Sequence, residues 1–222
     1  MKLLINEIFY SIQGETVTAG FPSVFIRLTG CNLNCRYCDT MYARVQGKLL
    51  GIPHIISLIQ KYPAAHHITI TGGEPLLQPV VNELLAVLCD LGFTCQLETN
   101  GSLSYKGVPR AVRKIVDVKT PSSGESGSFW MDGLSLMGPK DEFKFVIADT
   151  ADYEYARNFM NTNLMDCPSI VNFSPVYGEM PYEKLAGLIL QDGLKVRLNL
   201  QMHKIIWCGE EKKIDETLPD EN

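Results

Sequence analysis

Hydrophobic residues recur along the chain with two alternating periods, and this pattern predicts alternating strands and helices. Short runs rich in β-branched and aromatic residues end at Gly, Pro, Asn or Ser, whereas longer stretches repeat with a helical period. The predicted strands cover residues 23–28, 68–71, 93–99, 114–119, 142–147, 170–173 and 195–200. The predicted helices cover residues 52–61, 79–91, 151–160 and 182–190.

Alternation of strands and helices over short links predicts parallel strands joined by right-handed crossovers. About six strands are too few for an eight-stranded barrel, so we expect an α/β fold that forms a partial, open parallel barrel. Segments 100–113 and 120–141 are too short or too rich in Gly, Pro and Ser for standard helices, so the helix set should be reduced. We expect one domain over residues 1–208 and a charged, disordered tail over 209–222.

Composition excludes several classes of partner. The 222 residues carry a formal net charge of −5, which leaves no broad basic surface for nucleic acid or anionic membrane. No apolar run approaches the roughly 20 residues that cross a bilayer, and Asn6 and Glu7 interrupt the apolar start before a signal core forms. We therefore expect a cytoplasmic protein with no membrane or nucleic-acid partner.

Cysteine spacing indicates a metal centre. Three of the seven cysteines, Cys31, Cys35 and Cys38, form a CxxxCxxC motif just after the strand at 23–28. Thiolates hold iron–sulfur cubanes, usually four of them, so three would leave one iron open for a ligand. A structural zinc site would need a fourth ligand, and the nearest histidines, His54, His66 and His67, lack ligand spacing. Zinc remains the less favoured alternative. The other cysteines, expected to be small apolar fillers or incidental, are Cys89, Cys95, Cys167 and Cys208.

The motif, with aromatic Tyr37 before its third cysteine, resembles the signature of the radical S-adenosylmethionine (SAM) superfamily. The resemblance implies a [4Fe-4S] cluster on Cys31, Cys35 and Cys38 whose open iron binds SAM and cleaves it to a 5′-deoxyadenosyl radical. The segment 71–75, Thr-Gly-Gly-Glu-Pro, resembles the superfamily's GGEP element. Both motifs fall at predicted strand ends, where parallel α/β barrels place their ligands.

A finer resemblance, from Asn6 to about Lys204, is to the 7-carboxy-7-deazaguanine synthase family. It is carried by the segments 12–15 (IQGE), 25–32 (FIRLTGCN), 38–40 (CDT), 98–101 (ETNG) and 201–204 (QMHK). The family's reaction is a radical ring contraction of 6-carboxy-5,6,7,8-tetrahydropterin with loss of ammonia, on the pathway to queuosine in tRNA. The resemblance implies a homodimer, an electron donor such as flavodoxin or ferredoxin, and no residue acting as acid or base.

The same resemblance implies roles for individual residues. Those expected at SAM are Tyr37, Cys38, Asp39, Gly73, Asp117, Val118, Lys119, Ser174, Pro175, Val176 and Tyr177. Those expected at the substrate are Ile12, Gln13, Gly14, Arg27, Thr71 and His203. Thr40 is expected to ligate Mg²⁺ together with substrate oxygens. The family often has Ser-Pro-Lys where this chain has Asp117-Val118-Lys119, and the chain extends beyond the family's usual end.

Simpler interpretations remain open at several positions. Arg27 suits a substrate carboxylate because a guanidinium offers two parallel hydrogen bonds, but it could be an exposed ion-pairing residue. His203 could be a satisfied polar group near the last strand, and Thr40 a turn residue. Two other functions also remain: a glycyl-radical activating enzyme acting on a protein, and a non-enzymatic iron–sulfur electron carrier. The carrier would need a fourth cysteine ligand.

Overall fold

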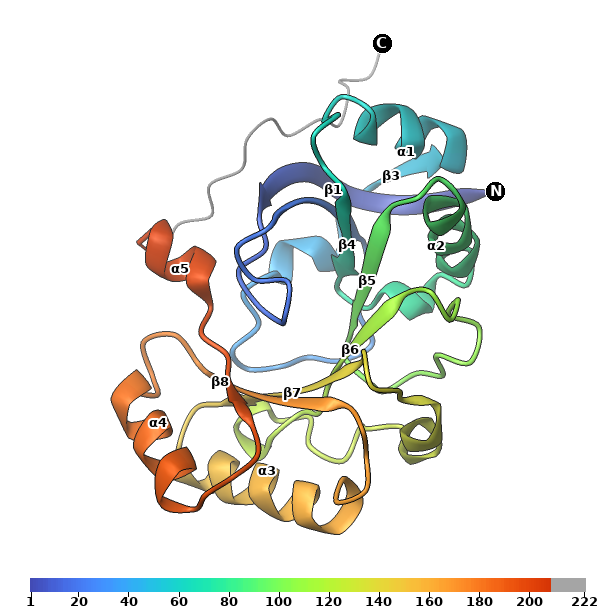
Figure 1. Ribbon diagram of the computed structural model, residues 1–222. Coiled ribbons are helices and arrows are strands. Elements are labelled where there is room, and N and C mark those ends of the chain that lie inside the picture. Colours follow the sequence, from blue (N-terminus) through green and yellow to red (C-terminus); the bar gives the residue numbers. More distant parts are fainter. Residues whose placement is uncertain (209–222) are drawn as a thin grey trace.

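A curved nine-stranded sheet organises residues 1–208, the part of the chain that this computed structural model describes (Figure 1). The strand order is β3-β1-β2-β4-β5-β6-β7-β8-β9, and β2 and β4 to β9 run parallel. The strands are β1 Lys2–Ile12, β2 Pro22–Leu28, β3 Lys48–Gly51, β4 His67–Gly72, β5 Thr94–Thr99, β6 Arg113–Asp117, β7 Glu142–Ile147, β8 Ile170–Pro175 and β9 Arg197–Leu198. This confirms the predicted partial, open α/β barrel. The sheet has nine strands rather than about six, and β1 pairs antiparallel with both β2 and β3.

Helices cover the outer face of the sheet, and their ends follow the expected punctuation (Figure 1). They are α1 Ile52–Ile59, α2 Val81–Asp90, α3 Thr150–Asn163 and α4 Tyr182–Gln191, whereas the short α5 Met202–Ile206 packs against the loop after β1. For example, α2 is followed by Gly92 at a φ of 87°, a left-handed conformation that glycine adopts without strain. The sequence patterns predicted α1 to α4 but not α5.

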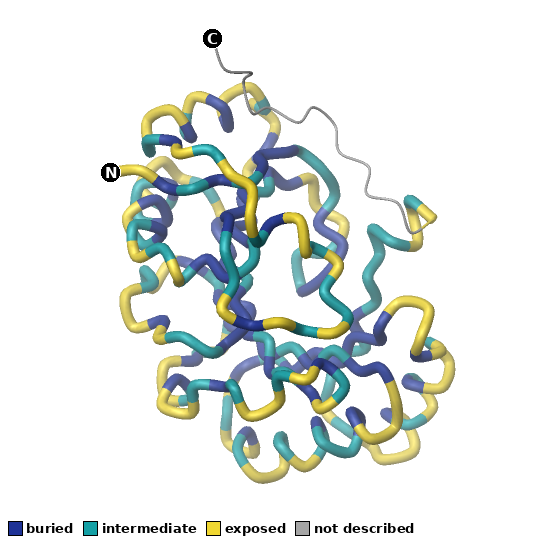
Figure 2. The backbone as a smooth tube through the Cα atoms, turned by 180° about the vertical axis from the view of Figure 1, so that it is seen from behind, coloured by how far each residue is buried: buried dark blue, intermediate teal, exposed yellow. Residues whose placement is uncertain are grey.

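Side chains alternate between the two faces of each strand, which separates an apolar outside from a polar inside. On β7, Phe143 and Phe145 pack outward, and Lys144 between them points into the barrel. Two apolar clusters result: one joins β1, β2, β4 and β5 to α1 and α2, and the other joins β6, β7 and β8 to α3 and α4. Figure 2 shows the buried backbone concentrated in the strands and the exposed backbone in outer turns and loops.

The long strand β1 was not predicted, because its alternation changes phase halfway along. The pairing of β1 with β2 slips between Ile5 and Glu7, so a bulge lies at this point. Before the slip Ile5 packs outward, and after it Ile8 does, while Glu7 and Phe9 face inward. Because the apolar positions shift by one residue at Asn6 and Glu7, the sequence lacks the strict two-residue alternation by which a strand is predicted.

The reduced crossovers agree with the sequence patterns. Residues 100–112 contain no helix, and residues 120–141 contain two 3₁₀ turns, η3 Pro121–Ser123 and η4 Met131–Leu136. Two further 3₁₀ turns, η1 Met41–Arg44 and η2 Pro75–Leu77, follow the motif regions. The predicted tail at 209–222 lies outside the described residues. Within residues 1–208, no helix has the length and apolar character needed to cross a membrane.

Candidate active site

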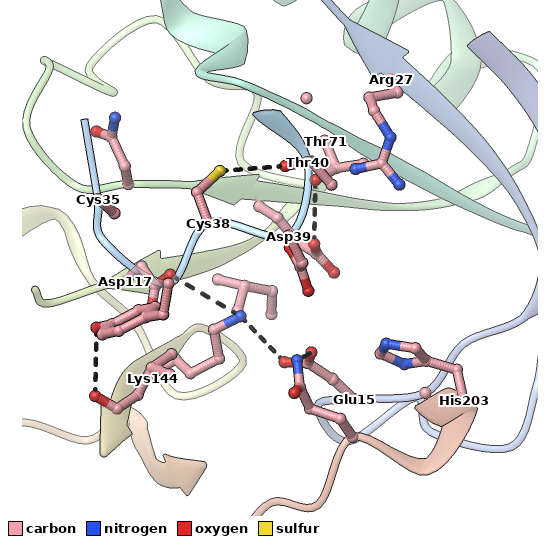
Figure 3. Close-up of a pocket in the computed structure, with 18 of the residues that line it drawn as sticks. Glu15, Arg27, Cys35, Cys38, Asp39, Thr40, Thr71, Asp117, Lys144 and His203 are labelled. Carbon is pink, nitrogen blue, oxygen red and sulfur yellow. Dashed lines mark hydrogen bonds and ion pairs between the residues drawn. The ribbon is translucent and has the colours of Figure 1, made fainter. Parts of the chain in front are cut away.

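The ends of the parallel strands open into one cavity of about 530 Å³. Its wall combines the cysteine loop after β2, the ends of β4 to β8, the loop after β1, and α5 (Figure 3). A volume of this size is typical of small-molecule sites. Segments far apart in sequence meet here, because a parallel sheet collects all its strand ends at one edge.

Cys31, Cys35 and Cys38 all line this cavity, and their loop is tied down by distant segments. The Asn34 N–H donates to the Glu125 carboxylate at 2.6 Å, and the Arg36 N–H donates to the Ser123 carbonyl at 2.9 Å. The Arg36 guanidinium also binds Glu179 through two hydrogen bonds of 3.2 and 2.8 Å. The loop is therefore held in place by the η3 segment and by the segment before α4.

The three thiols fit a multi-iron group better than a single ion. Within residues 1–208, no three His, Cys, Asp or Glu side chains converge closely enough to ligate one metal ion. A zinc ion would require such convergence, whereas in a cubane each thiolate binds a different iron. Burial raises the pKa of Cys35, with Lys119 opposing and Asp117, Cys38 and Cys31 adding to the rise. A cluster that takes up thiolates would offset this cost.

Gly73, at the end of β4, packs directly on the cysteine loop. A Cβ atom here would overlap the carbonyl of Gly30 and lie 2.8 Å from Cys31 Cβ. These are backbone and near-backbone atoms that cannot give way. The absence of a side chain at Gly73 therefore lets strand β4 approach the cysteine loop, while Gly73 itself lines the cavity.

Glu74 joins three parts of the site and is fully buried. Its carboxylate accepts hydrogen bonds from the Asn100 N–H at 2.6 Å, the Thr99 hydroxyl at 2.8 Å and the Leu76 N–H at 3.0 Å. Its own N–H donates to the Gly30 carbonyl at 2.7 Å. Glu74 thus locks the GGEP element to the end of β5 and to the cysteine loop, so its role is structural.

The residues beside Cys38, namely Tyr37, Asp39 and Thr40, line the cavity. Burial raises the pKa of Tyr37 to about 12, and its hydroxyl lies 3.3 Å from Thr120 Oγ1. Asp39 forms an ion pair of 2.7 Å with Lys204 of α5. Thr40 Oγ1 lies 3.8 Å from Cys38 Sγ (Figure 3). The hydroxyl of Thr40 is therefore next to the predicted cluster.

Ile12, Gln13, Gly14, Thr71 and His203 also line the cavity. The Gly14 carbonyl accepts from the Met202 N–H at 2.9 Å, and a Cβ atom on Gly14 would fall on the His203 ring. The loop after β1 and helix α5 are therefore in direct contact. His203 belongs to this helix, next to the substrate residues expected from the loop.

Arg27 lines the cavity but is buried and already bound to a carboxylate. Its Nε lies 2.5 Å from Glu7 Oε1, and Arg27 is 7% exposed. The Phe9 and Tyr42 rings lie 5.7 and 5.8 Å from its guanidinium carbon. Arg27 does form an ion pair, as the simpler interpretation expected, but it is buried rather than exposed. Glu7, opposite Arg27 in the β1–β2 register, holds the guanidinium in place.

A chain of alternating charges crosses the cavity floor (Figure 3). Lys144 binds Glu15 at 3.0 Å and lies 3.9 Å from Asp117, which pairs with Lys119 at 2.7 Å. Burial opposes ionisation of Glu15, but Lys144, His203 and Gln201 outweigh it and lower its pKa to about 2. Burial would lower the pKa of Lys144, yet Asp117, Glu15 and Glu98 raise it well above its usual value. Both groups are therefore ions.

Lys119, Val176 and Tyr177 line the cavity as well, whereas three predicted SAM residues do not. Val118 is buried, the Ser174 hydroxyl donates to the Asn199 carbonyl at 2.8 Å, and Pro175 ends β8. Sequence reasoning gave no role to Glu98 or Asn100, although it quoted their motif, and it missed Lys144 and Glu179. The pattern Phe-Lys-Phe at 143–145 contained a signal, because a parallel barrel buries both faces of its strands.

Comparisons with known proteins decide the family. A model of the radical SAM superfamily matches residues 25–124. The 7-carboxy-7-deazaguanine synthase of Koribacter versatilis is 41% identical, over 95% of this chain and 99% of its own length. The chain belongs to the 7-carboxy-7-deazaguanine synthase family. The synthase of Chlorobaculum tepidum, 42% identical over 92% of this chain and 94% of its own length, is a second such relative.

Solved structures share the fold of this chain. The crystal structure of QueE from Escherichia coli has a TM-score of 0.76 at 24% identity and covers 91% of this chain and 95% of its own. Streptococcus suis SuiB, solved with its precursor peptide, has a TM-score of 0.53 at 16% identity. The match covers 78% of this chain and 46% of the SuiB chain.

Proposed function

We propose that this chain is a 7-carboxy-7-deazaguanine synthase that converts 6-carboxy-5,6,7,8-tetrahydropterin with loss of ammonia. The observation that carries the proposal is one cavity in which the cysteine motif meets a polar wall suited to a small acid. Membership of the synthase family supports the same activity, because the relatives of that name match nearly the whole chain.

Cys31, Cys35 and Cys38 would hold a [4Fe-4S] cluster, with SAM bound beside it along Tyr37, Gly73 and Lys119. When bound, the cluster and SAM supply a one-electron cleavage that yields the deoxyadenosyl radical. The chain itself holds the loop rigid through Glu74 and Glu179 and surrounds the reacting atoms with protein. Keeping water away from a radical is the main service that such a cavity provides.

The polar wall suits a pterin acid. In the proposal, Arg27 binds the substrate carboxylate through guanidinium N–H groups, while its Nε stays on Glu7. Gln13 and the backbone of Ile12 and Gly14 line the cavity beside it and offer donors and acceptors to the pterin edge. His203 belongs to α5, and its ring packs directly against Gly14.

Mg²⁺ belongs to the proposal as a second cofactor. Thr40 is a hard oxygen donor near Cys38, and Mg²⁺ keeps several waters and substrate oxygens among its ligands. A neutral hydroxyl binds weakly, so the ion would be held well only with substrate present. In the native protein, turnover should rise several-fold with Mg²⁺, and in Thr40→Ala this response should be absent.

The two alternative functions fit the site less well. A glycyl-radical activating enzyme must admit a protein loop, whereas α5 and its Lys204–Asp39 ion pair cover one side of this cavity. An electron carrier needs a fourth cysteine ligand, and none of Cys89, Cys95, Cys167 or Cys208 lines the cavity. The proposal includes a reduced flavodoxin or ferredoxin as electron donor, a homodimer and a cytoplasmic location.

An anaerobic assay tests the function. Reconstituted protein is incubated with SAM, a reductant and 6-carboxytetrahydropterin, and mass spectrometry looks for a product lighter by one ammonia. Native protein and Cys89→Ala should carry about four irons per chain and form the product, and Cys31→Ala should do neither. Absence of product from iron-loaded native protein would refute the proposal, as would full activity in Cys31→Ala.

A further inference from the structure

Glu98 lies on the cavity wall at the end of β5, between residues assigned to the substrate. Its carboxylate accepts hydrogen bonds of 3.2 Å from Thr71 Oγ1 on β4 and of 3.2 Å from Gln13 Nε2 after β1. A longer contact of 3.5 Å comes from Gln96 Nε2. These three donors are neutral, and no Lys or Arg in residues 1–208 forms an ion pair with Glu98.

Glu98 and Glu15 line the same cavity, but their surroundings shift the pKa values of the two carboxyl groups in opposite directions. Glu15 takes the Lys144 ammonium at 3.0 Å and is held as an ion. For Glu98, burial raises the pKa; Glu15 adds repulsion, while Lys144 and the hydrogen bonds from Thr71 and Gln13 oppose the rise. Two carboxyl groups whose pKa values are driven apart in one cavity are typical of an acid–base division of labour.

The proposed reaction needs proton transfers that a radical does not supply. Loss of ammonia breaks a C–N bond, the electron pair leaves on nitrogen, and that nitrogen must gain a proton. The contracted ring becomes aromatic by losing one proton from carbon. One proton is delivered and one is removed, with no net oxidation, so a single group can perform both transfers.

We propose that Glu98 serves first as general acid and then as general base in the loss of ammonia, an inference that rests on the proposed function. In the first half the Glu98 O–H bond breaks, its proton joins the leaving amine, and the C–N electron pair stays on nitrogen. In the second half the ring C–H bond breaks, its electrons form the ring double bond, and the Glu98 carboxylate takes the proton. The neutral acid is restored.

Other titratable groups on this wall suit the role less well. Glu15 is held as a carboxylate and has no proton to donate first, and the ammonium of Lys144, whose pKa Asp117 and Glu15 raise, is a poor proton donor. The Glu98 side chain also touches both Thr71 and Gln13, which places its oxygens beside the substrate assigned to them. This proposal differs from the sequence-based expectation that no residue acts as acid or base, because it assigns both roles to Glu98.

The test uses the iron-loaded full chain with three variants of one strand. Glu98→Gln keeps the shape of the side chain without its proton, Glu98→Asp keeps the acid, and Leu97→Met is the control. Leu97 directly precedes Glu98, is buried in the outer apolar cluster and lies off the cavity wall, and methionine is close to it in volume. In Glu98→Gln, SAM and pterin affinities by calorimetry should stay within about threefold, while product kcat falls about 100-fold or more.

Two further readouts separate proton transfer from substrate binding. Because the cycle starts from the neutral acid, native kcat should fall as pH rises through the Glu98 pKa. This limb should move to lower pH in Glu98→Asp and vanish in Glu98→Gln. In a quenched single turnover, Glu98→Gln should also accumulate an isomer with the mass of the substrate, in which the ring has contracted but ammonia remains.

Several results would overturn the inference. The inference fails if Glu98→Gln weakens pterin affinity but keeps native kcat at saturation, or if the pH limb persists in Glu98→Gln and vanishes in His203→Gln. If native protein made product and Leu97→Met lost as much kcat as Glu98→Gln, β5 distortion would explain the defect. Absence of product from native protein would remove both the proposed function and this inference.

Discussion

Charged side chains inside the barrel are held in pairs, and this decides how each can be tested. Arg27 and Glu7 are 7% and 1% exposed and lie 2.5 Å apart. Deleting either removes the counter-ion of the other inside the protein, which typically costs about 3–5 kcal/mol of stability. Arg27→Ala would therefore confuse a folding defect with loss of a substrate contact.

Arg27→Lys separates the two effects. A lysine keeps a cation for Glu7 but loses the planar fork that grips a carboxylate at two points. We expect the pterin Kd to rise at least tenfold while SAM affinity, iron content and the melting temperature stay near native values. Calorimetry with each ligand measures this. Equal loss of both ligands would remove Arg27 from the substrate carboxylate.

The location of a residue was predictable where a motif carried it, and not where folding created it. Cys31, Gly73 and Tyr37 were expected at one site because they belong to sequence motifs, and all three line the cavity. The position of Lys144 in the site was not predictable, because a lysine between two phenylalanines also fits a strand with one solvent-exposed face. Only in the folded protein does the curved sheet bring Lys144 to Glu15, which lies 129 positions away in the sequence.

Secondary-structure elements show the same division. Helix α2 and strand β7 were predictable from local punctuation and alternation, which their folded surroundings reinforce. Strand β1 was missed because its bulge moves the inward-facing positions by one residue. Helix α5 is only five residues long and depends on contacts such as Met202 to Gly14 rather than on its own periodicity.

Close packing of β4 on the cysteine loop yields a test at the level of elements. Gly73→Ala should displace the loop, because its Cβ would overlap the Gly30 carbonyl. Iron content and the visible absorbance of the cluster should fall to less than half of native. Gly187→Ala is the matched control: it lies in α4 with no atom within 4 Å of the added carbon, and should keep both. A native iron content in Gly73→Ala would contradict this packing.

For the whole molecule, the sheet is open, so it retains two edges at β3 and β9. Apolar side chains gather at the β3 edge, where Leu49 is 61% and Met1 76% exposed. Edges and apolar patches of this kind are commonly covered by a second copy around a two-fold axis. The homodimer that we propose would cover both the open β3 edge and the apolar side chains beside it.

Sedimentation at micromolar concentration tests the dimer and its location. Native protein should sediment at roughly twice 24.8 kDa, and Leu49→Asp should shift most of it to the monomer. Leu190→Asp replaces a side chain that is 80% exposed on α4 and should leave the dimer intact. A native monomer would contradict the dimer, and dissociation by Leu190→Asp would place the contact on α4 instead.

The contact between α5 and the loop after β1 also sets an order of events during synthesis on the ribosome. The three cysteines emerge with the first strands, whereas Gln201, which binds Glu15 at 2.9 Å, and Met202, which binds Gly14, emerge more than 160 residues later. Because chains begin to fold from the N-terminus, one side of the cavity stays open until translation has passed α5. Delivery of iron and sulfide to the cysteine loop can therefore precede closure of this side.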